Sequence, residues 1–240
     1  MFGPVSNSLL ASLPPQALTF LELESVVLPQ GTLIFEPNEP IDQVYFPETG
    51  MISMLVVTSD GDMVETAIIG REGAVGVQRG LGKRESLTRA TVQIAGRFLT
   101  MAASKFELAT AASPPIREMI IRYTEVLWAQ AQQIAACNAV HSASSRLCRW
   151  LLQSAQSVGS DQLTLTQEFI GQMLGVRRTT VTLLAQHLQD IGAIKYRRGR
   201  ISILDRPRLE ASACECYWVI SKIAERNTGF SLSAMRQEQK

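Results

Sequence analysis

The chain has 240 residues, of which 46% are hydrophobic and 19% are charged, and its formal net charge is +1 at pH 7. A chain of this length and composition can form one large or two small globular domains, each with a hydrophobic core. No segment approaches the ~20 apolar residues of a membrane-spanning helix, and the N-terminus has no basic segment followed by an apolar one. We therefore expect a cytoplasmic protein without a membrane partner.

The first half of the chain has the pattern of a small β domain. Residues 1–22 show a weak helical periodicity and are expected to cap the domain that follows. From about residue 25 to residue 99, short β-rich runs alternate with glycine-containing turns, and Asp60-Gly61 between two such runs is typical of a β-hairpin. This spacing predicts an antiparallel barrel or jelly roll.

Closely spaced glycines follow one of these predicted strands, in the sequence Gly70-Arg-Glu-Gly73-Ala-Val-Gly76. Such glycines can let backbone N–H groups surround a phosphate. They can equally form sharp turns at the rim of a barrel, and the local pattern favours turns. The spacing matches neither a dinucleotide-binding loop nor a P-loop.

A long helix is predicted from about residue 113 to residue 141, because Pro114 and Pro115 suit a first helical turn. Flanking charges favour the pairing of its apolar seam with the same helix of a second copy, as in a coiled coil, with Gln130 fixing the register. The alternative is that the seam packs on the chain's own barrel. The seam residues recur at steps of three and four: Ile116, Ile120, Tyr123, Leu127, Gln130, Ile134 and Cys137.

A further helix is expected over residues 142–158, ending at Gly159, and a helix-turn-helix follows over residues 164–191. A steep crossing of two helices needs a small residue where the backbones approach and a turn residue that tolerates positive φ, and Gly171 and Gly175 can fill these roles. Val176, Val181 and Leu184 are then expected to point inward and dock the second helix on the first.

The polar face of this second helix predicts a DNA-recognition surface. Arginine can bind guanine O6 and N7 in the major groove, and threonine can contact a base edge or a thymine methyl. The alternative is an ordinary helix pair with a solvated basic patch. The predicted DNA-binding residues, including those of the segment that follows, are Gln167, Arg177, Arg178, Thr179, Thr180, Thr182, Gln186, Arg197, Arg198 and Arg200.

Residues 194–204 alternate as in a short hairpin, with the turn near Arg198-Gly199, and predict a basic wing. Between residues 177 and 208 one Lys and seven Arg face only two Asp, so the local net charge is +6 in a chain whose total is +1. This asymmetry favours a nucleic-acid surface on one module. A last helix is predicted over residues 206–226.

The sequence predicts no metal site, no cofactor and no catalytic residue. Cys214 and Cys216 lie two apart on the predicted last helix, which would point them to opposite sides, and the other two cysteines form no cluster in the sequence. His141 and His187 are expected on a helix surface or at an interface. No Ser/His/Asp or Cys/His set is evident, so an enzyme is not expected.

With these elements in this order, the chain resembles the Crp/Fnr superfamily of bacterial transcription regulators, over about residues 20–220. The most specific match is EFIGQMLGVRRTTVTLLAQHLQDIGAI with the wing YRRGRISI; VYFPETGMIS and IIGREGAVGV match more loosely. The resemblance implies an α+β fold: an N-terminal jelly-roll barrel like cyclic-nucleotide-binding domains (1–112), a dimerisation helix (113–141) and a C-terminal winged helix-turn-helix (142–226). It also implies a homodimer, double-stranded promoter DNA and RNA polymerase as partners. The tail (227–240) is polar and lacks periodicity, so it is expected to be disordered.

The sequence departs from the family pattern in both halves. Relatives that bind cyclic AMP have a Gly-Glu pair whose Glu binds the ribose; here Gly76 is followed by Val77. They also have an Arg-Ser or Arg-Thr pair some ten residues later, and the sequence around Arg89 contains no clean match to an Arg-Ser pair. Tight binding of cyclic AMP is therefore not expected, because its charge-assisted bonds would be lost. The residues that the resemblance places at the effector pocket are Gly73, Gly76, Val77, Thr88 and Arg89.

Other departures concern sensing and DNA specificity. The oxygen-sensing branch has clustered N-terminal cysteines, whereas residues 1–136 contain none. Thr179 stands where many relatives carry an acidic base-reading residue and Leu183 where many carry Arg, so the target sequence is expected to differ. The alternative function is a small-molecule sensor that acts through protein contacts, but a protein partner would not require a local charge of +6.

Overall fold

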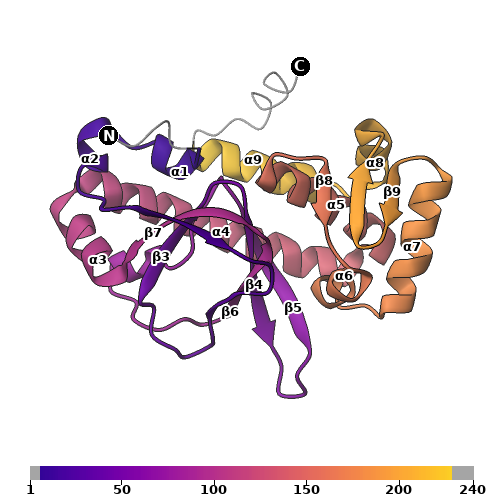
Figure 1. Cartoon of the computed structure of the whole chain (residues 1–240), viewed down its shortest axis with the longest axis horizontal. Helices are drawn as coiled ribbons and strands as arrows, with labels where there is room; N and C mark the ends of the chain where they lie inside the picture. Colours follow the sequence, from indigo (N-terminus) through magenta and orange to yellow (C-terminus); the bar gives the residue numbers. More distant parts are fainter. Residues whose placement is uncertain (1–5, 229–240) are drawn as a thin grey trace.

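The computed structural model describes residues 6–228, and for residues 226–228 it describes the backbone only. Figure 1 shows the β-rich half at one end of the molecule and the helix-turn-helix at the other, with helix α4 running between them. No helix within the described residues is both long enough and apolar enough to span a bilayer.

The N-terminal half consists of two antiparallel sheets, with strand orders β1-β7-β3 and β2-β6-β4-β5. Both sheets contribute to one apolar core, in which Phe46 and Phe98 are fully buried. The predicted α+β fold with an N-terminal jelly roll is confirmed. The bounds are α1 Ser8–Ala11, α2 Pro15–Leu18, β1 Glu24–Leu28, β2 Leu33–Phe35, β3 Gln43–Pro47, β4 Met51–Val57, β5 Met63–Ile69, the 3₁₀ helix η1 Val77–Leu81, β6 Arg89–Ile94, β7 Gly96–Ala102 and α3 Ala103–Ala112.

The hairpin expected at Asp60-Gly61 joins β4 to β5. Gly61 has φ +86°, and the N–H of Thr58 donates to the carbonyl of Asp62 (2.9 Å), which closes the turn. Glycine suits this position because it has no Cβ to clash at positive φ.

Helix α4 (Pro114–Val140) has the predicted length, but its heptad seam faces its own chain. Ile116, Ile120 and Tyr123 belong to the core of the β domain. Gln130, Ile134 and Cys137 are also buried within the chain, and Leu127 is half-buried against the same core as Tyr123. The expectation that these seven residues form the dimer seam is therefore wrong. The heptad pattern located an apolar stripe correctly, but the chain's own domains cover it.

The C-terminal half is built on a second core, whose largest buried side chain is that of Trp150 on α5. Met51, Leu55 and Ile68 of the β domain join this core, so the two halves pack directly against each other. The bounds are α5 Ala143–Val158, β8 Gln162–Thr164, α6 Gln167–Leu174, α7 Arg178–Asp190, β9 Ile194–Arg197, β10 Arg200–Ile203, α8 Arg206–Ser212 and α9 Cys216–Thr228.

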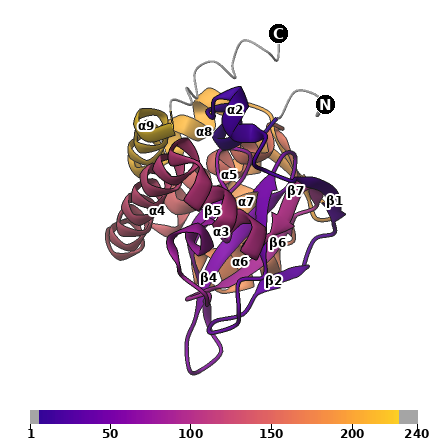
Figure 2. The ribbon, with the colours of Figure 1, turned by 90° about the vertical axis from the view of Figure 1, so that its left-hand side faces the viewer.

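The prediction of a single last helix over residues 206–226 is wrong, because the helix is interrupted between α8 and α9. After the break α9 returns along α4 (Figure 2). Cys214 precedes α9 and Cys216 begins it, so helical spacing does not separate their side chains. Both sulfurs lie beside Cys137 and His141. The expectation that these cysteines point apart is corrected. Of the predicted tail, residues 229–240 lie outside the described part of the chain.

Candidate DNA-binding surface

Two glycines set the angle between α6 and α7, in the roles that the sequence predicted. A Cβ atom on Gly171 would lie 2.8 Å from the carbonyl oxygen of Val176, so only glycine lets the two backbones approach this closely. Gly175 ends α6 with φ +61° and donates to the carbonyls of Gln172 and Gly171. Positive φ is uncommon for residues with a Cβ, which explains the glycine here.

Apolar contacts then hold α7 in place. Val181 is fully buried, and Val176 and Leu184 are half-buried against the same core. At the start of α6, the side chain of Thr166 accepts a hydrogen bond from the N–H of Phe169 (3.2 Å) as an N-cap. The inward residues of α7 are thus fixed, and its opposite face is directed to solvent.

The exposed face of α7 carries most of the residues predicted to recognise DNA. Thr182 donates to the side chain of Gln167 (2.8 Å), and Gln186 donates to Asp190 (2.7 Å). Leu183, which was not among the predicted DNA-binding residues, is 72% exposed on this helix. Arg177, Arg178, Thr179, Thr182 and Gln186 are exposed, whereas Thr180 and Gln167 are half-buried.

The wing lies beside α7. Arg198 and Gly199 both have positive φ (+51° and +73°), which is the conformation of a two-residue type I′ hairpin turn. The hydroxyl of Tyr196 donates to the carbonyl of Leu165 (2.8 Å) and fixes the wing to the helix-turn-helix. Strand β8 pairs with β10 and makes the wing three-stranded, a pairing that the sequence reading missed because β8 has three residues.

The basic residues of this module divide into two groups. Arg206 forms an ion pair with Asp161, and Arg208 forms one with Asp205; both pairs are structural contacts. Within residues 6–228, the other six have no carboxylate at ion-pair distance: Arg177, Arg178, Lys195, Arg197, Arg198 and Arg200. Their charge is therefore available to an external anion.

A groove runs between α7 and the wing. Arg178 and Thr182 line it on the helix side, and Tyr196, Arg198 and Gly199 line it on the wing side. Burial raises the pKa of Tyr196, and the nearby charge of Arg178 opposes this shift. The groove thus brings together residues from α6, α7 and the wing that are separate in the sequence.

The glycines of residues 70–76 are closely packed, and Gly70 and Gly73 lie against helices. A Cβ on Gly70 would meet Ser157 of α5, and one on Gly73 would lie 2.3 Å from the hydroxyl of Tyr123 on α4. Gly76 has φ +86°, and a Cβ there would lie 3.2 Å from Ile41 and 3.3 Å from Phe35. These contacts favour the interpretation as turns and close helix approaches over that of a phosphate loop.

The predicted effector-pocket residues are only partly brought together. Val77 is fully buried in the core beside Gly76. Arg89, by contrast, is on the face of β6 opposite to the core residue Ala90, where it forms a two-bond ion pair with Glu36 (2.9 and 2.7 Å). Thr88 precedes Arg89 outside the strand and is half-buried. The alternation of side chains along a strand explains the separation.

Two family models match the chain. The model of the Crp-like helix-turn-helix domain matches residues 145–212, and that of the cyclic nucleotide-binding domain matches residues 25–111. The chain is also 25% identical over 220 residues to a CRP-like cAMP-activated global transcriptional regulator of Mycobacterium tuberculosis, covering 89% of this chain and 96% of the relative.

Solved structures show the same fold. FixK2 from Bradyrhizobium japonicum superposes with a TM-score of 0.69 at 19% identity, covering 81% of this chain and 98% of its own. The c-di-GMP-responsive global regulator CLP of Xanthomonas campestris superposes with a TM-score of 0.63 at 14% identity, covering 79% of this chain and 99% of its own.

Proposed function

The chain belongs to the Crp/Fnr superfamily of DNA-binding transcription regulators, and we propose that two copies of it bind an inverted-repeat operator through α7 and the wing. The observation that carries this proposal is the exposed face of α7, where Arg178 and Thr182 line a groove with Arg198 of the wing. We assign sensing to residues 1–112, dimerisation to 113–141 and DNA binding to 142–226.

The two kinds of residue in this surface have different roles. Arg178, the first residue of α7, enters the major groove and binds a guanine edge. Thr179, Thr182 and Gln186 contact neighbouring bases, and exposed Leu183 suits the methyl group of a thymine. Arg177 and the wing residues Arg197, Arg198 and Arg200 bind phosphates, which position the protein without reading sequence.

We propose that the dimer forms through the face of α4 opposite to the buried seam. Ile121 (43% exposed) and Trp128 (68% exposed) are seven residues apart on this face, and Ala135 continues the spacing. Val140 is 73% exposed near the end of the same helix. Apolar residues that recur every seven positions and are left in solvent are suited to pack against the same helix of a second copy.

Tight binding of cyclic AMP is not part of the proposal. A cyclic phosphate needs a guanidinium beside it, and Arg89 is paired with Glu36 on the opposite face of β6 from the core. Val77 supplies no carboxylate for a ribose hydroxyl, and Phe35 and Ile41 lie against Gly76. The M. tuberculosis relative is described as cAMP-activated, so the two proteins would differ in this respect.

Genome-wide footprinting of the protein tests the proposal. It predicts one enriched sequence motif, an inverted repeat whose half-site centres are about 10 base pairs apart, because each α7 of a dimer enters one of two successive major grooves. The operator duplex should then bind far more tightly than its scrambled version at ~150 mM salt. Equal binding to the two duplexes would contradict the proposal.

A further inference from the structure

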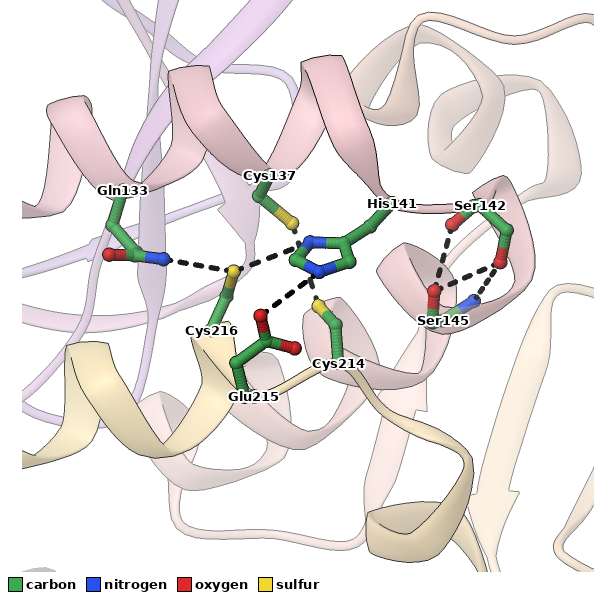
Figure 3. A network of polar contacts seen from close by, with 8 residues as sticks. All are labelled: Gln133, Cys137, His141, Ser142, Ser145, Cys214, Glu215 and Cys216. Carbon is green, nitrogen blue, oxygen red and sulfur yellow. Dashed lines mark hydrogen bonds and ion pairs between the residues drawn. The ribbon is translucent and has the colours of Figure 1, made fainter.

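Four side chains that can bind a metal meet where α4 ends and α9 begins (Figure 3). Cys137 and His141 are one helical turn apart at the end of α4, so they project from the same face. Cys214 comes from the link between α8 and α9, and Cys216 is the first residue of α9. Their ligand atoms, three sulfurs and one imidazole nitrogen, all lie within 4.8 Å of one another.

The separations agree with a single tetrahedral ion. Zinc binds sulfur at ~2.3 Å and imidazole nitrogen at ~2.0–2.1 Å, so its ligand atoms are roughly 3.5–3.8 Å apart. In this cluster the sulfurs of Cys137 and Cys214 are 3.5 Å apart, and the sulfur of Cys216 is 3.5 Å from Nδ1 of His141. A cluster of several iron atoms, each bound by one of these side chains, would need ligand atoms that lie farther apart.

The groups around the four ligands orient them. His141 presents Nδ1 to the sulfur of Cys216, while its Nε2 is 3.2 Å from Oε1 of Glu215. A metal-binding histidine usually donates its other ring N–H to a carboxylate in this way. The amide of Gln133 donates to the sulfur of Cys216 (3.0 Å), which suits a thiolate.

Burial and charge add to this arrangement. Cys137 and Cys216 are fully buried, and Cys214 is 5% exposed. Burial, together with the hydrogen bond to Cys137, raises the pKa of Cys214 to about 12. A divalent cation would offset the free-energy cost of ionising these buried thiols, since three adjacent thiolates repel one another in the absence of a cation. The buried guanidinium of Arg149 lies close enough to act on Cys137 and Cys214, and would balance the residual negative charge.

We propose that Cys137, His141, Cys214 and Cys216 bind one Zn²⁺ ion through three thiolates and Nδ1 of the imidazole. With four protein ligands the site is closed, so its role is structural. His141 is also the C-cap of α4, directly before the N-cap Ser142 of α5. The ion therefore ties α9 to the end of the long helix, at the junction that leads into the DNA-binding module. Binding releases the protons of the thiols that are not yet ionised.

Metal analysis of the full-length protein, purified anaerobically under reducing conditions, tests the proposal. We expect about one zinc per chain, and replacement by Co²⁺ should give the visible absorption of a tetrahedral thiolate complex. Cys214→Ser and His141→Ala should lose most of the metal. Cys148→Ser should retain it, because Cys148 lies in the second core, outside this cluster.

A milder variant keeps the test decisive if the cysteine variants fail to fold. Glu215 is exposed (71% for its side chain), so Glu215→Gln should fold normally. It should weaken zinc binding by ~10–100-fold in competition with a chelator, because it alters the partner of the histidine. These readouts do not depend on DNA binding. A metal-free wild-type protein, a Cys137–Cys214 disulfide, or iron with acid-labile sulfide in place of zinc would each overturn the proposal.

Discussion

The indole N–H of Trp150 donates a hydrogen bond of 2.7 Å to the buried carboxylate of Glu65, which joins α5 to strand β5. The hydroxyl of Ser53 donates to the other oxygen of the same carboxylate (2.6 Å). A buried polar group must keep its partners, because leaving it unsatisfied costs about 1–3 kcal/mol. This contact therefore specifies how the β domain sits on the DNA-binding half.

The same carboxylate should make stability depend on pH. Burial raises the pKa of Glu65 from 4.5 to about 7, although the hydrogen bonds of Ser53 and Trp150 and the charge of Arg149 lower it. The folded state thus holds the proton more tightly than the unfolded state. This contribution to stability is complete below about pH 4.5 and is lost as the pH rises through about 7.

Glu65→Gln tests this dependence. The amide cannot ionise, so the decline in the free energy of unfolding between about pH 5 and pH 7, at most ~1.4 kcal/mol per pH unit, should flatten. Urea unfolding across this range measures it, with Glu118→Gln on the exposed surface of α4 as the control. Identical pH slopes for Glu65→Gln and the wild type would contradict the assignment.

Gly171→Ala should disrupt the helix-turn-helix. Its Cβ would lie 2.8 Å from the carbonyl oxygen of Val176, so α7 must move, at a cost of about 1–3 kcal/mol in unfolding free energy and with loss of specific DNA binding. Gly175→Ala is the matched control. Its Cβ meets open space, so only the strain of positive φ is expected, about 1–2 kcal/mol, with α7 in place. Wild-type DNA binding by Gly171→Ala would argue against this account.

Trp128→Ala should weaken the dimer by at least ~30-fold, because a large aromatic side chain at the centre of an interface is a typical hot spot. Sedimentation at several protein concentrations measures the dissociation constant. Ile120→Ala, on the buried seam, should instead lower unfolding free energy by about 2–5 kcal/mol. If Ile120→Ala dissociates a folded dimer and Trp128→Ala does not, the interface has been placed on the wrong face of α4.

Cyclic AMP should leave the melting temperature unchanged at concentrations up to about 1 mM. A ligand at 100 times its dissociation constant stabilises a protein by about 2.7 kcal/mol, so tight binding would be evident. The M. tuberculosis relative, described as cAMP-activated, provides the positive control. A clear rise in the melting temperature of this protein would show that its pocket accepts the nucleotide despite the position of Arg89.

The sequence predicted the features that depend on local chemistry. Gly171 and Gly175 were identified because a steep helix crossing and a positive φ each exclude most other residues. The turn at Arg198-Gly199 followed from the same reasoning. Such features need no knowledge of what the rest of the chain does, since the cause and the effect are a few residues apart.

Features that depend on distant contacts were predicted less well. The heptad of α4 showed that Ile120 and Tyr123 would be buried, but an apolar stripe does not reveal whether its own domain or a second copy covers it. Cys137 and Cys214 are 77 residues apart, and their contact depends on the break that directs α9 back along α4. The sequence analysis placed Cys214 and Cys216 on one helix and therefore expected their side chains to point apart, whereas Cys214 lies in the link between α8 and α9.

The proposed function depends on Arg178 recognising a base while Arg198 binds phosphate. Titration of the wild type, Arg178→Ala and Arg198→Ala with the operator and with single-base variants of it, at several salt concentrations, tests this most directly. Arg178→Ala should lose about 1–3 kcal/mol on the operator and lose its preference at one base position, whereas Arg198→Ala should weaken binding to all duplexes alike and reduce the salt slope by about 1. If Arg178→Ala retains the full base preference of the wild type, α7 is not the reading helix.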